Sequence, residues 1–364
     1  EADGARDRLR EGRTALTALQ GERPMVFDMV DAHAVADVVA LWTGIPVGRM
    51  LADELRDVMG LEALMGRRIR GQDQALHAIG QAMRTSRAGL TDVRKPTGVF
   101  LMVGVSGVGK TETAMTLADM FYGGAENMSV INMAEFKEEH KVSMLLGAPP
   151  GYVGYGEGGV LTEAVRRKPF GVVLLDEMEK AHPGVQDVFY QLFDKGRIKD
   201  GQGRDIDFRN TMIVMTSNAG SDAIERLCAD PDTMPDAEGL VRALRPELLK
   251  RFKPAFLGRV TVVPYFPLSP GTLLEIVGLS LDRLGNRLAD SYAATLTWDE
   301  AVVDLIAARC NEAQSGARNV EAVIAGTIAP ELAGMLLQRR LDALPTSSVR
   351  ISVDKVGNLT YLFE

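Results

Sequence analysis

Between residues 99 and 266, short apolar runs alternate with segments that mix polar and apolar positions. These runs are rich in Val, Ile, Leu and Met, which is typical of strands that are covered on both faces. Strands that alternate with helical segments predict a parallel sheet built from β-α-β units. The expected strands are residues 99–103, 129–133, 171–175, 211–216 and 260–264.

On both sides of this region the spacing of apolar residues changes to three and four positions, which predicts amphipathic helices. Before it, the pattern predicts helices over residues 51–65 and 72–86. After it, the same spacing returns in residues 270–288, 299–311 and 318–340. The chain therefore changes from alternating strands and helices to a predominantly helical region.

A period of two residues marks the end of the chain, where apolar residues alternate with polar ones on either side of residues 354–358. This alternation predicts a β-hairpin. The predicted fold class is α/β, with a large parallel-sheet domain and a smaller helical domain that ends in the hairpin. We expect a peripheral segment over residues 1–50, the large domain over 51–266 and the small domain over 267–364.

The segment after the first predicted strand reads Gly-Val-Ser-Gly-Val-Gly-Lys-Thr and fits the phosphate-loop pattern G-x-x-x-x-G-K-[ST] between a strand and a helix. Its glycines allow a tight turn whose backbone N–H groups face one anion, at the positive end of a helix. Lys110 is expected to reach the β- and γ-phosphates, and the Thr111 hydroxyl to bind Mg²⁺. The alternative is a glycine-rich turn without a ligand. The predicted phosphate-binding residues are Gly104, Val105, Ser106, Gly107, Val108, Gly109, Lys110 and Thr111.

Polar side chains also follow two of the other predicted strands. Asp176 and Glu177 close one strand; the first suits a Mg²⁺ ligand acting partly through water, and the second a base for the attacking water. Asn218 follows another strand, where its amide can hold the same water. Because ligands bind at the carboxyl ends of parallel strands, we expect these residues beside the phosphate loop. Solvated strand ends, and an Asn bonded to its own turn, are the alternatives.

Two arginines are candidates for stabilising phosphate charge. Arg259 precedes the last predicted strand, and an arginine at such a strand edge can act on the γ-phosphate of a neighbouring subunit. Arg318 begins a helix of the small domain and could reach the phosphates of its own chain. From spacing alone, a surface ion pair is the competing interpretation for each of them.

Residues 147–159 are too rich in glycine and proline for a helix or a strand and predict a mobile loop. Tyr152 and Val153 lie in this loop. An aromatic side chain on such a loop is a good contact for another polypeptide, although it could also pack against its own domain.

Composition limits the classes of partner. The 364 residues carry a net charge of −8, which argues against a nucleic-acid surface. Apolar runs stay short of a membrane span of about 18 residues, so we expect no membrane partner. Cys228 and Cys310 lie far apart in sequence and favour free thiols in a reducing cytosol. The first residue is not Met and falls in a polar helical stretch, which is typical of a piece of a longer protein.

Together these motifs resemble the second nucleotide-binding module of the Clp-family AAA+ ATPases, over nearly the whole chain from about residue 31. The resemblance implies ATP and Mg²⁺ as cofactors, ATP hydrolysis in the bacterial cytoplasm, and a homo-oligomeric ring, a hexamer, that unfolds and translocates a polypeptide. It also implies a preceding first module and an amino-terminal domain, with the first 40 or so residues resembling the tail of the segment that joins the modules.

Residue by residue, the resemblance makes 104–111 the Walker A motif, and Asp176 with Glu177 the Walker B motif. Asn218 becomes sensor 1, Arg318 sensor 2, and Arg259 an arginine finger for the adjacent subunit. Tyr152 and Val153 become the pore loop that holds the translocated polypeptide. The adenine pocket is implied at Ile45, Pro46, Val47 and Ile69. Arg70 departs from the family pattern, which has an apolar residue there, and this puts the adenine contact at that position in doubt.

Within the family, the chain most resembles the ClpV branch of bacterial type VI secretion, whose implied substrate is the contracted sheath. The distinguishing stretches are Val105-Ser106, residues 112–114, residues 136–140, Met178 and residues 253–260. A general disaggregase of the ClpB kind is the alternative enzyme. Two alternatives come from other classes. A nucleotide-gated oligomeric scaffold with little hydrolysis is disfavoured by the retained catalytic residues. A DNA-handling motor is disfavoured by the acidic net charge.

Overall fold

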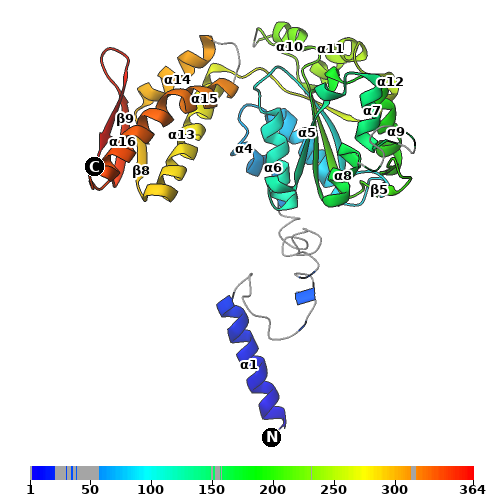
Figure 1. Ribbon diagram of the computed structural model, residues 1–364, viewed down its shortest axis with the longest axis horizontal. Helices are drawn as coiled ribbons and strands as arrows, with labels where there is room; N and C mark the ends of the chain where they lie inside the picture. Colours follow the sequence, from blue (N-terminus) through cyan, green and yellow to red (C-terminus); the bar gives the residue numbers. More distant parts are fainter. Residues whose placement is uncertain are drawn as a thin grey trace.

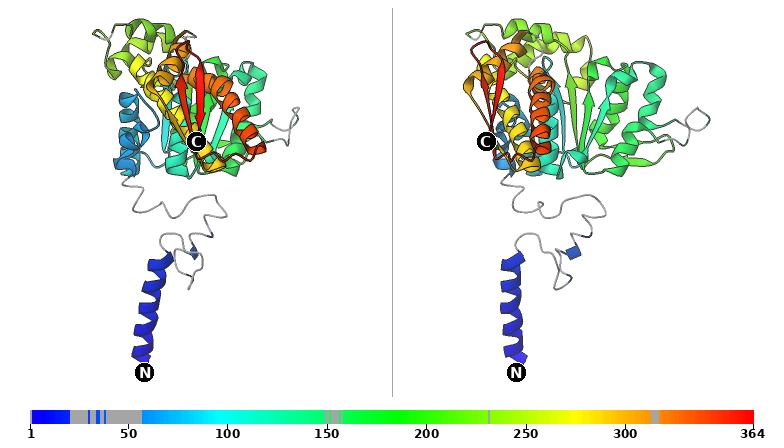
Figure 2. Two further views of the ribbon diagram at one scale, coloured as in Figure 1. Left: turned by 90° about the vertical axis from the view of Figure 1, so that its left-hand side faces the viewer. Right: turned by 60° about the vertical axis from the view of Figure 1, so that its left-hand side comes forward.

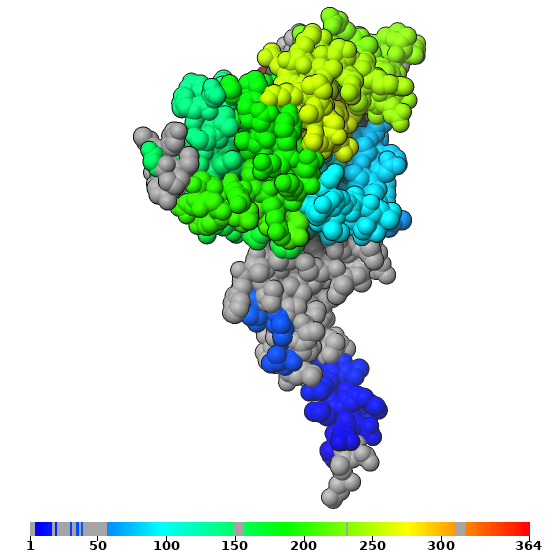
Figure 3. Space-filling view, turned by 90° about the vertical axis from the view of Figure 1, so that its right-hand side faces the viewer, coloured from blue at the N-terminus to red at the C-terminus, as the bar shows by residue number. Residues whose placement is uncertain are grey.

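The computed structural model describes residues 2–20, 30, 34, 35, 38, 57–148, 151, 156, 158–230, 232–312 and 317–364. The elements from α4 (Leu61–Gly66) to β7 (Thr261–Pro264) form an α/β unit and those from α13 (Pro270–Tyr292) onward form a C-terminal unit, and the two lie side by side (Figure 1). Helix α1 (Ala2–Gln20) stands clear of both units, and Figure 3 shows it, in dark blue, away from the α/β unit. Its leucines at positions 9, 16 and 19 are exposed and belong to neither core.

A five-stranded parallel sheet with the strand order β2-β3-β6-β1-β7 forms the centre of the α/β unit. This confirms the predicted parallel sheet, because each expected apolar run coincides with one strand. The order brings the carboxyl ends of β1, β3 and β6 next to one another, and Val103 of β1 pairs with Ser217 of β6. The strand bounds are β1 Gly98–Val103, β2 Met128–Asn132, β3 Gly171–Asp176, β6 Thr211–Ser217 and β7 Thr261–Pro264.

Helices cover both faces of the sheet (Figure 2). Neighbouring side chains of a strand point to opposite faces, so Leu101 and Val103 join one hydrophobic core while Phe100 and Met102 join the other. Helices α4 (Leu61–Gly66), α5 (Asp73–Arg87) and α6 (Lys110–Tyr122) cover the Phe100 side. The Leu101 side is covered by α7 Glu139–Leu146, α8 Val160–Arg167, α9 Gly184–Lys195, α10 Ser221–Leu227, α11 Ala237–Leu249 and α12 Pro254–Leu257.

Short elements complete the α/β unit. The sequence did not predict the antiparallel hairpin of β4 (Arg197–Lys199) and β5 (Asp205–Asp207). Its apolar content is small, with Ile198 and Ile206 paired at its centre and buried. The 3₁₀ turns are η2 Ala125–Asn127, η3 Met133–Phe136 and η4 Met178–Lys180.

The C-terminal unit combines helices with a small sheet of order β10-β9-β8. The antiparallel pair β9–β10 confirms the predicted terminal hairpin, and β8 joins it in parallel. Ser269 caps the first helix, since its Oγ accepts from the Thr272 N–H at 3.1 Å, and Pro270 follows at a position that needs no donor. The elements are α13 Pro270–Tyr292, β8 Thr295–Trp298, α14 Glu300–Glu312, α15 Ala317–Val323, η5 Ile324–Ile328, α16 Ala329–Leu341, β9 Ser348–Val353 and β10 Leu359–Phe363.

The continuous helix over α15, η5 and α16 is long and apolar enough, by length and composition alone, to cross a membrane. Its apolar positions have a local explanation, because Val320, Ile324, Ile328, Leu332 and Leu336 are buried within the C-terminal unit. A five-residue π-helical segment interrupts it. The large apolar residues Met335, Leu337 and Leu341 are exposed, so packing within the unit accounts for only part of its apolar character.

The buried side chain of Gln72 is hydrogen-bonded to the segment that connects the two units. The Gln72 side chain donates to the Phe266 carbonyl at 2.9 Å and accepts from the Phe266 N–H at 3.0 Å. Gln72 is only 1% exposed, so both bonds are shielded from water. They hold the start of α5 to the segment between β7 and α13.

Candidate nucleotide-binding site

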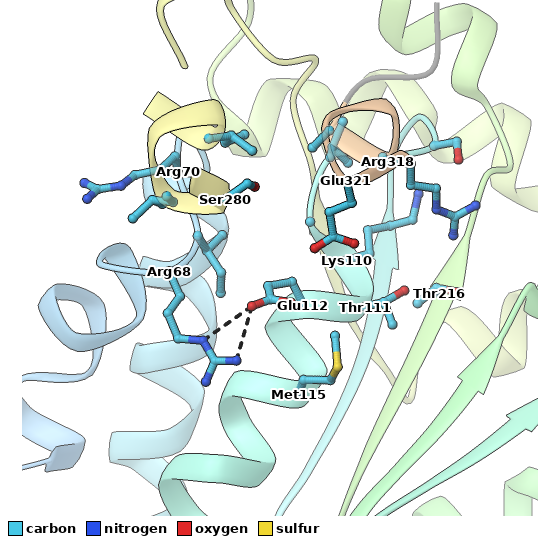
Figure 4. Close-up of a pocket in the computed structure, with 18 of the residues that line it drawn as sticks. Arg68, Arg70, Lys110, Thr111, Glu112, Met115, Thr216, Ser280, Arg318 and Glu321 are labelled. Atoms are coloured by element: carbon cyan, nitrogen blue, oxygen red, sulfur yellow. Dashed lines mark hydrogen bonds and ion pairs between the residues drawn. The ribbon is translucent and has the colours of Figure 1, made fainter. Parts of the chain in front are cut away.

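A cavity opens at the carboxyl edge of the sheet, between the two units. Its walls come from the phosphate loop and the start of α6, from the ends of β3 and β6, from residues 68–70, and from α13 and α15. Figure 4 shows Lys110 and Thr111 on the α/β side, with Arg318 and Glu321 of α15 above them and Ser280 of α13 across the space. Both units therefore contribute to one site.

The phosphate loop has the tight backbone that its glycines predict. Gly107 and Gly109 have φ values of 78° and 100°, in the region that favours glycine. A Cβ at Gly104 would lie 2.7 Å from the Cβ and 2.9 Å from the carbonyl oxygen of Tyr265. The loop thus needs glycine at position 104 for close packing, and at positions 107 and 109 for its turn.

Lys110 is enclosed at the base of the cavity, where it is 8% exposed. Its ammonium donates to the carbonyls of Gly104 at 2.5 Å and Val105 at 2.8 Å, and to Oδ1 of Asn218 at 2.9 Å. Burial lowers the pKa of Lys110 to about 8; the nearby carboxylates of Glu179 and Asp176 counteract this, and Arg318 adds to it. A cation so poorly hydrated gains strongly from an anionic ligand.

The two acids at the end of β3 are tied together through Thr216 on the neighbouring strand β6. The buried Thr216 hydroxyl donates to Oδ1 of Asp176 and accepts from the Glu177 N–H at 3.0 Å. Glu177 has a φ of 57°, an uncommon backbone conformation for a residue with a Cβ. Thr216 thereby fixes where both carboxylates leave the strand, a role that the sequence analysis missed.

Lys180 holds the Glu177 carboxylate in this structure. Its ammonium donates to Oε1 of Glu177 at 2.7 Å, and this hydrogen bond raises the pKa of Lys180. The pair is partly exposed, since the Lys180 side chain is 45% accessible. The ion pair is therefore a weak restraint that solvent and ligands can compete with.

Several other predicted residues also lie at this cavity. Asn218 and Arg318 line it, Asn218 through the contact with Lys110 and Arg318 from the first turn of α15. Ile69 is buried and forms part of the wall. The Ala317 N–H donates to the Gly107 carbonyl at 3.0 Å, so the backbone of α15 touches the phosphate loop directly. The structure thus brings together residues that lie more than 200 positions apart.

Arg259 lies outside this cavity. Its Nε donates to both carboxylate oxygens of Asp194, at 3.0 and 2.9 Å, and its Nη1 donates to the Ala255 carbonyl at 2.8 Å. The guanidinium also lies 5.4 Å from the centre of the Tyr190 ring. Its action on an adjacent subunit remains a prediction, and the half-exposed side chain is already oriented by its own chain.

Five predicted site residues fall outside the described part of the chain: Ile45, Pro46, Val47, Tyr152 and Val153. The base of the glycine-rich segment is described. Gly147 pairs with Gly158 in an isolated antiparallel bridge, and the Gly201 N–H of the β4–β5 turn donates to the Leu146 carbonyl at 2.9 Å. The hairpin that the sequence did not predict therefore supports this base.

Charged residues that the sequence analysis did not assign to the site complete the cavity. Oε1 of Glu112, which follows Thr111, accepts from Nη2 of Arg68 at 3.2 Å and from Nη2 of Arg283 at 2.9 Å. Arg283 also pairs with Glu321 at 3.4 Å. Arg283 and Glu321 come from α13 and α15, and nothing in their local sequence distinguishes them from ordinary surface charges of amphipathic helices.

The donor set fits a hard divalent cation. The Thr111 hydroxyl and the Asp176 carboxylate both line the cavity and supply the oxygen ligands that Mg²⁺ prefers, with room for water as the remaining ligands. Among the described residues, no cluster of three or more His, Cys, Asp or Glu could hold a metal ion by itself.

Fold and site together define a P-loop ATPase, and the family comparisons agree. The profile described as "AAA domain (Cdc48 subfamily)" matches residues 95–263, and that of the "C-terminal, D2-small domain, of ClpB protein" matches residues 268–351. The chain belongs to the Clp-family AAA+ ATPases, whose members hydrolyse ATP.

Individual relatives are similar over almost the whole chain. The AAA+ ATPase ClpV1 of Pseudomonas aeruginosa is 53% identical over 345 residues, which are 95% of this chain and 38% of that protein. The chaperone protein ClpB of Yersinia enterocolitica is 52% identical over 343 residues, 94% of this chain and 38% of that protein. The chain thus spans less than two fifths of the length of these relatives.

A solved structure has the same fold. The closed-state reconstruction of Hsp104 with ATPγS and FITC casein superposes with a TM-score of 0.77 at 32% identity, over 92% of this chain and 56% of that chain. The arrangement of sheet, helices and C-terminal strands therefore matches a known Hsp104 structure.

Thr216→Val is expected to reduce the rate of ATP hydrolysis about tenfold, because Asp176 loses a donor and the Glu177 N–H loses its acceptor. Valine keeps the shape of threonine, so no cavity forms, and the lost hydrogen bonds should lower the melting temperature without unfolding the chain. Steady-state turnover and the melting temperature measure the two effects separately. Thr211→Val, at the other end of β6, also removes a buried hydroxyl bond, to Phe208, and should lower the melting temperature but not turnover. Equal losses of turnover in both variants would contradict the positioning role of Thr216.

Proposed function

We propose that this chain binds ATP with Mg²⁺ and hydrolyses it at a site that a second copy of the chain completes. The convergence of Lys110, Asp176, Glu177 and Asn218 on one cavity, with Arg259 outside that cavity, carries the proposal. A site built only within one chain would leave Arg259 without a role in it. Copies arranged as a ring, a hexamer, give every site a neighbouring Arg259.

Each residue has a defined task in this proposal. Lys110 and the N–H groups of the phosphate loop hold the phosphates, and Thr111 with Asp176 holds Mg²⁺. When bound, Mg²⁺ neutralises charge on the phosphates. Glu177, released from Lys180, orients the attacking water and accepts its proton, while Asn218 holds that water from the opposite side.

Arginines complete this assignment. Arg318 supports the phosphates from the C-terminal unit, and Arg259 of the neighbour stabilises the charge that develops during hydrolysis. Ile69 forms part of the adenine wall, with Ile45, Pro46 and Val47 assigned to the same pocket.

We also propose that the two units are separate domains that meet at residues 266 and 267, and that the protein works in the bacterial cytoplasm.

The dependence of ATPase activity on protein concentration tests the shared site. Specific activity should rise steeply over the range in which sedimentation shows the chain assembling, and reach a plateau when the rings are complete. Constant specific activity from monomer to oligomer would mean that one chain holds a complete site. Assembly without hydrolysis would favour the nucleotide-gated scaffold.

We further propose that hydrolysis moves a polypeptide held by Tyr152 and Val153, and that this polypeptide belongs to the type VI secretion sheath. Similarity to the ClpV1 of Pseudomonas aeruginosa, at 53% identity, supports the sheath as substrate. The 52% identity with a protein named ClpB supports a second candidate, a general disaggregase. The full-length protein, incubated with contracted sheath and separately with heat-aggregated protein, distinguishes the two by which one it solubilises.

Tyr152→Ala is expected to stop processing of the polypeptide while ATP turnover stays near that of the unaltered protein, because the loop contacts the polypeptide rather than the nucleotide. Loss of an aromatic contact at a binding hot spot costs about 2 kcal/mol, which is about 30-fold in binding. Release of a fluorescent substrate protein and phosphate production, measured in the same sample with full-length protein, report the two activities. Tyr152→Phe keeps the ring and should retain processing. Normal processing by the alanine variant would remove this loop from the mechanism.

A further inference from the structure

Two ion pairs cross the cleft between the α/β unit and the C-terminal unit. Glu112, at the start of α6, accepts from Arg283 of α13 at 2.9 Å. Arg70, just before α5, lies with its Nε 3.6 Å from Oε2 of Glu275, which is also on α13. Arg70 is the residue that departs from the family pattern, and its ionic partner in the other unit gives that departure a structural reason.

The two ion pairs have opposite polarity across the cleft: in one the α/β unit carries the positive charge, and in the other it carries the negative charge. The α/β unit supplies a base at Arg70 and an acid at Glu112, while α13 supplies an acid at Glu275 and a base at Arg283. Glu275 and Arg283 lie eight residues apart, about two helical turns. A shift of α13 that placed Arg283 beside Arg70 would bring like charges together, so the pattern favours one register over displaced ones.

Neighbouring contacts support this pattern. Arg68 shares the Glu112 carboxylate with Arg283, and Glu321 of α15 lies 3.4 Å from Arg283. The side chain of Glu112 is 22% exposed and that of Arg283 is 37% exposed, so this pair is less screened by water than an ordinary surface pair. Next to the other pair, Gly71 approaches the Thr272 side chain so closely that a Cβ would lie 2.7 Å from it.

We propose that these two ion pairs form a charge clasp that sets the position of α13 against the phosphate-loop helix before a nucleotide binds. Arg70, Glu112 and Arg283 line the cavity, whereas Glu275 does not and acts only through Arg70. The four are positioning residues, because they set the position of α13, which forms one wall of the cavity. The consequence for affinity rests on the proposed ATP-binding function, but the clasp itself does not.

Charge reversal across the Arg70–Glu275 pair tests the clasp in the nucleotide-free chain. Spin labels at Gln81→Cys on α5 and Asp290→Cys on α13 report the distance between the units, in a Cys228→Ser background with the buried Cys310 retained. Glu275→Arg should broaden or shift the distance distribution, and Glu275→Arg combined with Arg70→Glu should restore it. Arg287→Glu, a charge reversal of equal size and opposite sign one turn after Arg283, should leave it unchanged.

Nucleotide affinity gives an independent measurement. Glu275→Arg should weaken binding of a fluorescent ADP analogue about threefold, the size expected for a partly exposed ion pair. Glu275→Gln should lose less affinity, and its affinity should change less than that of the unaltered chain when salt is raised from about 0.02 to about 0.5 M, roughly the range over which such pairs become screened. Glu275 is 61% exposed, and circular dichroism can confirm that the variants are folded.

The outcomes separate the clasp from the proposed function. If the distance distributions of Glu275→Arg and of the double variant both match that of the unaltered chain, the clasp does not exist. Failure of the double variant to restore the distribution would overturn the pairing of Arg70 with Glu275. If the unaltered chain did not bind ADP at all, the proposed function would fail, while the distance measurement would still decide whether the clasp exists.

Discussion

Replacing Glu177 with glutamine is expected to slow ATP hydrolysis about 100-fold or more, with ATP affinity within about twofold of the unaltered chain. Glutamine keeps the length of the side chain, but its amide cannot take a proton from water. Lys110, which we propose to hold the phosphates, donates hydrogen bonds to the carbonyls of Gly104 and Val105 and to Asn218 rather than to Glu177. The variant should therefore lose ATP hydrolysis but keep ATP binding. Equilibrium binding of a fluorescent ATP analogue and single-turnover phosphate release measure them.

The chain provides a matched control for this substitution. Glu247 pairs with Lys250, three residues later, at 2.7 Å, the same spacing and distance as Glu177 with Lys180. Glu247→Gln removes an equivalent ion pair away from the cavity and should not change hydrolysis. Rapid hydrolysis by Glu177→Gln would assign the base elsewhere. Equal slowing in both variants would attribute the effect to the loss of the ion pair.

Replacing Arg259 with alanine is expected to reduce turnover about 1,000-fold in assembled protein while each chain still binds ATP. The physical reason is the loss of a positive charge that the neighbouring subunit needs when phosphate charge develops. Within its own chain the Arg259 guanidinium bonds to Asp194 and Ala255, and alanine can make neither bond. The pair with Asp194 is more than a third exposed, so we expect a stability loss below about 1 kcal/mol. Turnover, ATP affinity and melting temperature together distinguish catalysis from folding.

A mixing experiment shows whether Arg259 acts between subunits. Lys110→Ala should abolish ATP binding, because the main cation at the phosphates is removed. In mixed rings, a site from an Arg259→Ala chain can meet the intact Arg259 of a Lys110→Ala neighbour, so two inactive proteins should regain activity together. No recovery, in rings shown to contain both chains, would contradict action between subunits. Arg209→Ala, which removes a surface arginine paired with Asp207, is a control that should remain active.

The central sheet was predictable because its inner strands β1, β3 and β6 are buried on both faces and contain few polar residues. Val99 and the four residues after it carry this signal without help from distant contacts. The hairpin of β4 and β5 was not predictable in the same way. Each of its strands has one apolar residue, Ile198 or Ile206, between charged neighbours, which is too little for a periodic pattern. Its pairing depends on the surrounding fold.

Some residues of the candidate site were likewise predictable from local sequence, and others were not. Residues in short motifs, such as Lys110, Thr111 and the acids at 176 and 177, were found from spacing, and the structure brings them to one cavity. Arg283 was missed because its role depends on which face of α13 meets Glu112, and spacing carries no information on that packing. Thr216 was missed for a similar reason, since its hydroxyl bonds across to a neighbouring strand.

The hydrogen bond from the Ala317 N–H to the Gly107 carbonyl has an evolutionary consequence. Both partners are main-chain atoms, so most replacements of the Ala317 side chain leave the donor in place. Proline is the exception, because it has no N–H to donate. The side chain at position 317 can therefore vary while the backbone of α15 keeps its hydrogen bond to the phosphate loop.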